Sequence, residues 1–364
     1  MATSKQIIDC LIKRKPTERM GLFELIWADT QRKWAESGYP KDSEGNPVSP
    51  CDHFGFDMDF ACDWWDIMPL KGHLELVEES DTWEIKRNGA GAALKYWKQK
   101  SGTPEHIDFR MTSRQIWDRD YRSHLLKLDP SRINLEYSKK QIQKCRQQGR
   151  WAFYGHMFVF ESLRQSMGDI CLYESVLLDP DWIHDYNRVY TDFFKMHYRY
   201  LFENIGIPDG IWMYEDLGYK GTTFCSQQIY DTLFFPYYKE MIDFFHGYGL
   251  PVVLHSCGFI EELVPRFIEL GFDALNPMEN KAGCDPLRLA KAYADKLTFI
   301  GGLNVSILES GDRQFIRDQV TALAKGMKDA GASYIFASDH SISTSVTYDD
   351  YKYALEIFRE NSSY

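Results

Sequence analysis

The second half of the chain alternates between short apolar segments and longer segments whose apolar residues recur at helical spacing. Apolar runs of strand length predict buried strands, and recurrence at three and four residues predicts amphipathic helices. Strands that alternate with helices in this way indicate right-handed βαβ units in a parallel sheet. The expected strands are 210–214, 251–254, 272–275, 297–301 and 333–337, and the expected helices are 227–248, 260–270, 285–294 and 313–330.

This repetition favours one architecture. Five consecutive strand–helix units within about 150 residues fit a (β/α)8 TIM barrel. A doubly wound sheet is the alternative, but no Gly-rich phosphate loop follows any of the expected strands. We therefore predict an α/β fold in which residues 1–364 form a single barrel domain, with 150–364 as its most regular part.

The first half of the chain is less regular. The run 19–27 is expected to be the first barrel strand, and 151–160 resumes strand-like patterning. Between them, about 28–125 is irregular and rich in aromatic residues, with loops marked by Gly and Pro. Within it, 74–87 predicts a β-meander that ends in the turn Asn88-Gly89. We interpret 28–125 as an elaboration on the barrel and not as a separate domain.

Composition narrows the classes of partner. The net charge is -11, and no block of basic residues occurs, which argues against nucleic acid and anionic membrane surfaces. No apolar run approaches the roughly 20 residues of a membrane-spanning helix, and 6–13 predicts an amphipathic helix rather than a signal peptide. The eight cysteines are scattered without CxxC pairs. A soluble protein of the reducing cytoplasm is expected.

The strongest candidate for chemistry is the pair His255 and Cys257. Both stand at the end of the expected strand 251–254, and residues two apart on a strand point to the same side. An imidazole nitrogen and a thiolate that converge there form half of a zinc site. A buried thiol beside a hydrogen-bonded histidine is the alternative, and it is the commoner reading of an isolated His-x-Cys.

Other polar residues follow neighbouring strands. Because reactive groups in a TIM barrel come from the carboxyl ends of strands, this clustering predicts a site in the barrel mouth. Each has a structural alternative, such as a helix cap, a rim salt bridge, or an aspartate that fixes a histidine tautomer. The residues are Glu215, Asp216, Asn276, Glu279, Lys281, Asn304, Asp339 and His340.

We assign expected roles to these residues. Candidate catalytic groups are Glu215, Asp216, Asp339 and His340, and Glu215 is also the candidate third metal ligand beside His255 and Cys257. Candidate substrate-binding residues are His156, Asn304, Glu279 and Lys281. For His156, in the run 155–160, a satisfied core histidine is the favoured alternative.

Several of these segments resemble the uroporphyrinogen decarboxylase superfamily. Within it, the chain is most similar to the corrinoid-dependent methyltransferases, including those of aromatic O-demethylation. The specific motif is Leu254-His255-Ser256-Cys257-Gly258. The supporting segments are 102–107, 214–220, 279–283, 301–305 and 338–342.

The resemblance implies a TIM barrel and zinc bound by His255 and Cys257. Thiol-methylating members carry a further cysteine near the last strand, whereas here 337–340 contains none, which argues against thiolate activation. The remaining ligand is left open among Glu215, Asp216 and His340. Decarboxylases carry an early arginine-rich motif, but 19–27 offers a single arginine, so porphyrinogen decarboxylation is not favoured.

The expected function is therefore that of a zinc-dependent methyltransferase. It would move a methyl group from an aromatic methyl ether, a methoxylated phenol, to the cob(I)alamin of a separate corrinoid protein. No Asp-x-His-x-x-Gly corrinoid motif occurs in the chain. The alternatives are methyl transfer from a methyl-corrinoid to a thiol or pterin, a metal-free decarboxylase, and a non-catalytic partner of a corrinoid protein; a homodimer is also left open.

Overall fold

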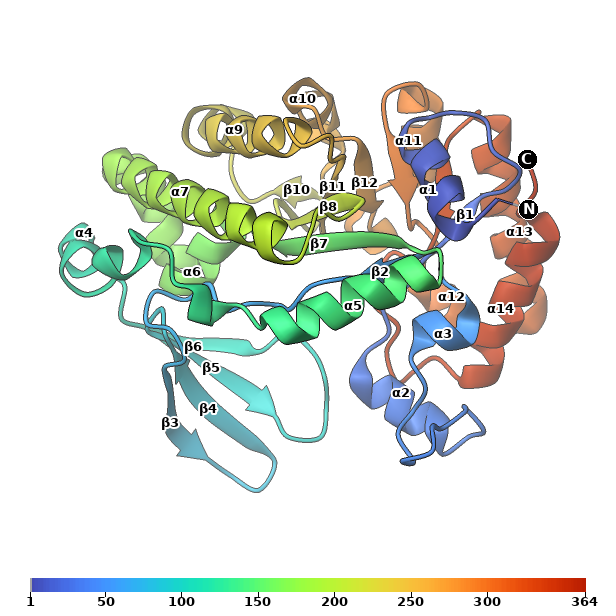
Figure 1. The fold of residues 1–364 in the computed structure, drawn as a ribbon, viewed down its shortest axis with the longest axis horizontal. Coiled ribbons are helices and arrows are strands. Elements are labelled where there is room, and N and C mark those ends of the chain that lie inside the picture. The colour runs from blue at the N-terminus through green and yellow to red at the C-terminus, as the bar shows by residue number, and fades with distance from the viewer. Residues whose placement is uncertain (1) are drawn as a thin grey trace.

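Eight parallel strands form a nearly closed barrel in the computed structural model, which describes residues 2–364 (Figure 1). The order around the barrel is β1-β14-β13-β12-β11-β8-β7-β2, so from β2 onward each barrel strand pairs with the next one along the chain, and the last strand, β14, pairs with β1. The expected (β/α)8 TIM barrel is confirmed. The strands are β1 (Gly21–Leu22), β2 (Met58–Phe60), β7 (Trp151–Met157), β8 (Gly210–Tyr214), β11 (Val252–Ser256), β12 (Ala274–Pro277), β13 (Thr298–Ile300) and β14 (Tyr334–Phe336).

A few hydrogen bonds link the first and second barrel strands. The Asp57 amide donates to the Leu22 carbonyl at 2.8 Å, and the Leu22 amide donates to the Asp57 carboxylate at 2.8 Å. Arg19 adds a bidentate contact to the same carboxylate, with both distances 2.7 Å. One buried carboxylate thus connects β1 to β2 where the two strands share no regular ladder.

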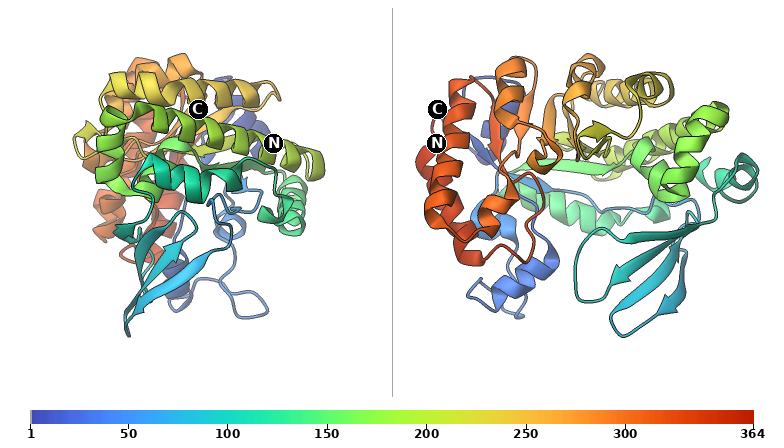
Figure 2. Two further views of the ribbon diagram at one scale, coloured as in Figure 1. Left: turned by 90° about the vertical axis from the view of Figure 1, so that its left-hand side faces the viewer. Right: turned by 180° about the vertical axis from the view of Figure 1, so that it is seen from behind.

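Helices surround the barrel (Figures 1 and 2). Their buried residues follow helical spacing, as in α13, where Asp312 caps the first turn and the apolar face packs inward. The main helices are α2 (Ala28–Ala35), α3 (Pro50–Phe54), α4 (Arg114–Ile116), α5 (Leu135–Gln147), α6 (Val159–Leu178), α7 (Pro180–Asn204), α8 (Gln227–Ile229), α9 (Phe235–His246), α10 (Val264–Leu270), α11 (Pro286–Tyr293), α12 (Val305–Glu309), α13 (Arg313–Asp329) and α14 (Tyr348–Asn361).

Helix α1 (Ser4–Ile12) closes the amino end of the barrel. Its apolar side chains Ile7, Ile8, Leu11 and Ile12 are buried against inward-facing strand residues. The Thr298 hydroxyl, at the start of β13, donates to the Leu11 carbonyl. The helix is therefore part of the barrel core, and the opposite, carboxyl end of the strands is where a site can open.

The segment between β2 and α5 holds a second sheet, which projects away from the barrel (Figure 1). It is antiparallel, in the order β3-β4-β5-β6, so the expected meander over 74–87 is present and extends further. Strand β2, however, lies inside the range 28–125 that we interpreted as an elaboration, so this part of the chain also supplies barrel structure. The strands are β3 (Leu74–Glu79), β4 (Trp83–Asn88), β5 (Ala92–Trp97) and β6 (Glu105–Phe109).

Within residues 2–364, none of the helices combines the length and the apolar character that crossing a membrane requires.

Candidate metal centre

His255 and Cys257 lie at the carboxyl end of β11, as the sequence predicts. The strand pairs with β8 on one side and β12 on the other, which places His255 beside Tyr214 and Asn276. After Cys257 the chain turns at Gly258, whose φ is 82°. A β-carbon at this position would lie 2.2 Å from the backbone of Gly218, in the hairpin β9 (Gly218–Tyr219) and β10 (Thr222–Thr223). Only glycine fits this approach.

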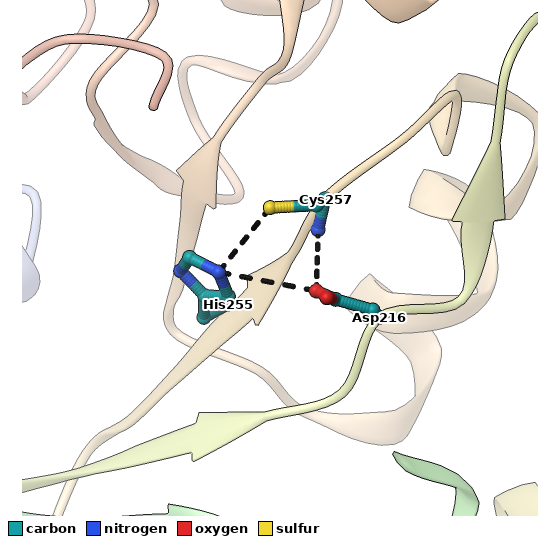
Figure 3. Close-up of side chains that lie close together, drawn as sticks. All are labelled: Asp216, His255 and Cys257. Carbon is teal, nitrogen blue, oxygen red and sulfur yellow. Dashed lines mark hydrogen bonds and ion pairs between the residues drawn. The ribbon is translucent and has the colours of Figure 1, made fainter. Parts of the chain in front are cut away.

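Asp216 completes a cluster with this pair (Figure 3). His255 Nε2 lies 3.4 Å from Cys257 Sγ and 3.9 Å from Asp216 Oδ1. One ligand atom from each of the three residues lies within 4.8 Å of the others. The Cys257 amide donates to Asp216 Oδ1 at 2.9 Å, which fixes the carboxylate next to the thiol.

The imidazole of His255 is held in the tautomer that metal binding needs. The Asn276 amide nitrogen donates to the Ile300 carbonyl at 3.0 Å, so Asn276 Oδ1 faces His255 Nδ1, at 2.5 Å. The Nδ1 hydrogen is therefore donated to Asn276, and Nε2 presents its lone pair to the cluster. Burial lowers the pKa of His255, which keeps the ring neutral.

The Cys257 thiol behaves differently. Burial raises its pKa well above the ordinary value, and the carboxylates of Asp216 and Glu279 raise it further. A thiolate at this position consequently needs a cation beside it. Without a cation the surroundings favour the neutral thiol, and a bound cation would favour the thiolate.

The donor set fits zinc. Ligand atoms 2.0–2.3 Å from a tetrahedral zinc ion lie about 3.3–3.6 Å from one another. The sulfur–nitrogen distance of 3.4 Å falls in this range, and the nitrogen–oxygen distance of 3.9 Å is slightly wider. Three protein ligands of types N, S and O leave one tetrahedral position for a ligand from solution.

Two chambers meet at this cluster. The first, which we call the aromatic chamber, has a volume of about 380 Å³ and includes Phe23, Glu24, Trp27, Ser338 and His340 in its walls. The second, the lysine chamber, has a volume of about 450 Å³ and includes Tyr219, Lys220, Phe224, Glu279 and Lys281. Both chambers are also lined by Arg164, Asp216 and Cys257. A ligand in either chamber can therefore reach the candidate metal position.

Comparison with known proteins identifies the family. The family model described as "Uroporphyrinogen decarboxylase (URO-D)" matches residues 176–361, half of the chain. The chain belongs to the uroporphyrinogen decarboxylase family. The matched region contains β8 and β11–β14, and with them all three residues of the cluster.

The solved structures that resemble this chain are distant from it in sequence. A methyltransferase from Methanosarcina mazei superposes with a TM-score of 0.70 over 99% of both chains, at 12% identity. A psychrophilic glycoside hydrolase family 10 endo-beta-1,4-xylanase covers 60% of this chain and 74% of its own, at 12% identity and a TM-score of 0.39. No curated protein matches the sequence. At 12% identity, the similarity to the Methanosarcina mazei methyltransferase shows a shared fold and nothing more.

Glu215 does not reach the cluster of this URO-D family barrel. Neighbouring residues after β8 point to opposite sides, so Asp216 faces the mouth while Glu215 faces the surrounding helices. Its carboxylate accepts hydrogen bonds from the Phe158 and Phe160 amides, at 2.8 and 2.9 Å, and from the Tyr238 hydroxyl. Burial raises the pKa of Glu215 to about 8. The third ligand position, which we expected Glu215 to fill, is therefore occupied by the carboxylate of Asp216.

Asp339 and His340, both candidate catalytic groups, do not pair with each other, so the alternative of an aspartate that fixes the His340 tautomer does not apply. The buried Asp339 carboxylate accepts from the Asn280 amide at 2.9 Å and the Val305 amide at 2.8 Å, so it joins the loops after β12 and β13. His340 is exposed, lines the aromatic chamber and meets the Trp27 ring edge-on with centroids 5.9 Å apart. Of the two, only His340 lines a chamber.

The four residues expected to bind substrate separate into two groups. Glu279 and Lys281 line the lysine chamber, where Glu279 also accepts from the Gly258 amide at 2.7 Å. Asn304 caps α12 by accepting from the Ser306 amide, and it lines neither chamber. His156 is buried with Nε2 2.8 Å from the Trp65 carbonyl, and burial lowers its pKa to about 3. Its position matches the alternative of a core histidine.

Among the lining residues that were not predicted as site residues, Glu24 and Arg164 are ionisable and lie outside every segment that carries the family resemblance. Glu24, inside the apolar run 19–27, accepts from the Ser338 amide and hydroxyl, both at 2.9 Å, and burial raises its pKa to about 8. Arg164 comes from α6, in a segment for which no strand end was predicted. Glu24 could have been noticed as a charged residue within an apolar run, whereas nothing in the sequence around Arg164 marks it as a site residue.

Proposed function

We propose that this protein is a zinc-dependent methyltransferase that removes the methyl group of an aromatic methyl ether and passes it to the cob(I)alamin of a separate corrinoid protein. The observation that carries the proposal is the cluster of Asp216, His255 and Cys257 at the junction of two chambers. A three-ligand site that opens on a cavity is typical of catalytic and not structural zinc.

The proposed zinc ligands are Asp216 Oδ1, His255 Nε2 and Cys257 Sγ. Bound zinc would supply Lewis acidity toward the ether oxygen of the substrate. Asn276 holds the His255 ring in its tautomer, and the Cys257 amide holds Asp216. Glu215, whose carboxylate is engaged by backbone amides, is not among the proposed ligands.

The aromatic chamber is the proposed site of the methyl donor. Its volume of about 380 Å³ lies within the range of small-molecule pockets. Phe23 and Trp27 offer apolar walls to a ring, and Glu24 and His340 offer polar contacts to ring substituents. Phenolate is a poor leaving group, so the enclosed walls matter because they reduce the access of water where charge develops.

Decarboxylation of an acidic porphyrinogen receives less support from the structure. The aromatic chamber contains one arginine, Arg164, and its guanidinium is already paired with Glu161. Four substrate carboxylates would meet little unpaired positive charge there. Transfer from a methyl-corrinoid to a thiol or pterin uses the same zinc site, and a screen of methyl acceptors against methyl donors separates it from our proposal.

The test begins with the metal content of the purified protein. We expect about one zinc ion per chain, lost in Cys257→Ser and Asp216→Asn, because each change removes one of three ligands. Glu215→Gln and Cys284→Ser are the matched controls, since Glu215 points away from the cluster and the Cys284 sulfur donates to the Gly258 carbonyl. Both controls should retain zinc.

The activity assay then combines the zinc protein, a reduced corrinoid protein and a methoxylated phenol. We expect the free phenol to appear with methylation of the corrinoid, followed by chromatography and by absorbance. Cys257→Ser should abolish this conversion while its circular dichroism spectrum stays that of the parent protein. Full zinc and full activity in Cys257→Ser would exclude the proposed ligand set.

A further inference from the structure

Arg164 stands where the two chambers meet. It lines both of them, together with Asp216 and Cys257, and its side chain is only 17% exposed. A ligand whose oxygen approaches the candidate metal position from either chamber therefore also approaches this guanidinium. Arg164 has no role in the ligand set proposed above.

The guanidinium is held in place but not fully used. Nε and Nη2 donate to the two carboxylate oxygens of Glu161, at 2.9 and 3.0 Å. The Phe224 ring packs against it, with the guanidinium carbon 5.0 Å from the ring centroid. Among the described residues, Nη1 has only a long contact, 3.5 Å to Asp169 Oδ1. This nitrogen carries two hydrogens, so it keeps the capacity to donate to a ligand.

The charges of the residues around the junction indicate what the free Nη1 of Arg164 could bind. In the proposed zinc site, the carboxylate of Asp216 and the thiolate of Cys257 balance the two positive charges of the ion. The Glu24 carboxyl, with its pKa raised to about 8 by burial, is protonated at neutral pH and adds no negative charge. Among the residues that line the aromatic chamber, Arg164 is the one arginine or lysine, and it shares its charge with Glu161 through Nε and Nη2 while Nη1 stays available to a ligand.

We propose that Arg164 binds the aromatic oxygen of the methyl donor as that oxygen becomes a phenolate. The inference rests on the proposed function. The bond between the methyl carbon and the ether oxygen breaks, and its electron pair stays on the oxygen. The new bond to the methyl carbon uses an electron pair of the partner's cob(I)alamin, so no proton is needed until the phenolate departs. A fixed cation beside that oxygen stabilises the charge it gains.

A second arginine provides a matched control. Arg188 on α7 also pairs bidentately with a glutamate, Glu240, at 2.9 and 3.0 Å, and packs over an aromatic ring, Tyr237, at 5.4 Å. It lines neither chamber. Arg188→Gln therefore removes the same kind of interaction as Arg164→Gln without touching the site.

The experiment uses 4-nitrophenol, whose visible absorbance distinguishes phenolate from phenol. The probe is titrated with pH in the presence of protein treated with a chelator, so that zinc does not contribute. Because the Asp216 carboxylate is present in every variant, the variants are compared with one another. We expect the pKa of bound 4-nitrophenol to be about one unit lower in the parent protein and in Arg188→Gln than in Arg164→Gln, the effect of one nearby opposite charge, and Arg164→Lys should keep part of this shift.

Glu161→Gln supplies an opposite change. Removal of the carboxylate frees Nε and Nη2 of Arg164, so the pKa of bound 4-nitrophenol should fall further than in the parent protein. This variant and Arg164→Lys decide the question if Arg164→Gln fails to fold, as circular dichroism would reveal. A shift of the same size in Glu161→Gln and Arg164→Lys as in the parent would overturn the inference.

Two further outcomes separate this inference from the proposed function. Failure of the parent protein to bind 4-nitrophenol, or an unchanged shift in a folded Arg164→Gln, refutes the role of Arg164 even where demethylation is observed. An Arg164-dependent shift in a protein that holds no zinc and transfers no methyl group supports the phenolate site and refutes the methyltransferase proposal. The binding assay needs neither metal nor corrinoid protein.

Discussion

Two adjacent carboxylates, Glu215 and Asp216, have opposite surroundings. Asp216 faces His255 and Cys257, whereas Glu215 is buried among backbone amides behind the barrel wall. Both residues were predicted at a strand end, but the sequence did not show which one faces the barrel mouth. That depends on where the alternation of side chains along the strand stops. His255 and Cys257 were predictable because their spacing of two keeps them on one side whichever register holds.

Glu24 should make the stability of the protein depend on pH. Its pKa is about 8 in the folded state because it is buried, against an ordinary value of 4.5. Between those values the folded carboxyl keeps a proton that the unfolded chain releases, so the contribution of Glu24 to stability is fully present below about pH 4.5 and is lost as pH rises to about 8. The slope from one such group is up to about 1.4 kcal/mol per pH unit.

Glu24→Gln removes this titration, so its free energy of unfolding should vary less between pH 5 and pH 8 than that of the parent protein. The measurement is urea denaturation at several pH values. Glu44→Gln, at an exposed position in a loop, is the control and should leave the slope unchanged. Equal slopes in Glu24→Gln and the parent protein would show that Glu24 is ionised when folded.

At the scale of elements, the loop after β11 depends on a close crossing of two chain segments. Gly258 and Gly218 approach so closely that a β-carbon on Gly258 would lie 2.2–2.7 Å from backbone atoms of Gly218. The Phe259 amide donates to the Tyr219 carbonyl at 2.8 Å and fixes the crossing. The hairpin β9–β10 is thereby attached to the loop that carries Cys257.

Gly258→Ala should be costly for this reason. We expect it to lower the free energy of unfolding by about 2–5 kcal/mol, from a left-handed backbone and from overlap with Gly218 together. Gly221→Ala is the matched control, because its φ of 72° is also left-handed but no atom lies within 4 Å of the added carbon. Its cost should be about 1–2 kcal/mol. Similar denaturation midpoints for the two variants would contradict the crossing described here.

The accuracy of the sequence analysis differed between elements. The strand expected at 210–214 is β8 itself, because a five-residue apolar run between polar segments leaves little ambiguity. Strand β2 was not predicted and was included in the irregular region, because it has only three residues and Asp59 stands at its centre. Arg164 could not be located from sequence, because a helix residue reaches the mouth only through the packing of α6.

At the scale of the whole molecule, α1 determines how the barrel can be reached. Ile8 and Leu11 fill the amino end so closely that a β-carbon on Gly21 would lie 2.7 Å from Ile8. Both chambers open among residues that follow the carboxyl ends of the strands. In the proposed reaction, the methyl donor, the demethylated product and the corrinoid protein would therefore all use this one side.

We therefore expect an obligatory sequence of events. The ether has to bind before the corrinoid protein binds, and the phenol can dissociate only after the corrinoid protein has dissociated. A large excess of corrinoid protein over enzyme should consequently slow steady-state turnover, which initial rates at increasing partner concentration would reveal. A rate that climbs to a plateau and stays there would mean that the small molecules have a route of their own. Because α1 closes the amino end of the barrel, a corrinoid protein bound over the carboxyl end would block the exit of the phenol.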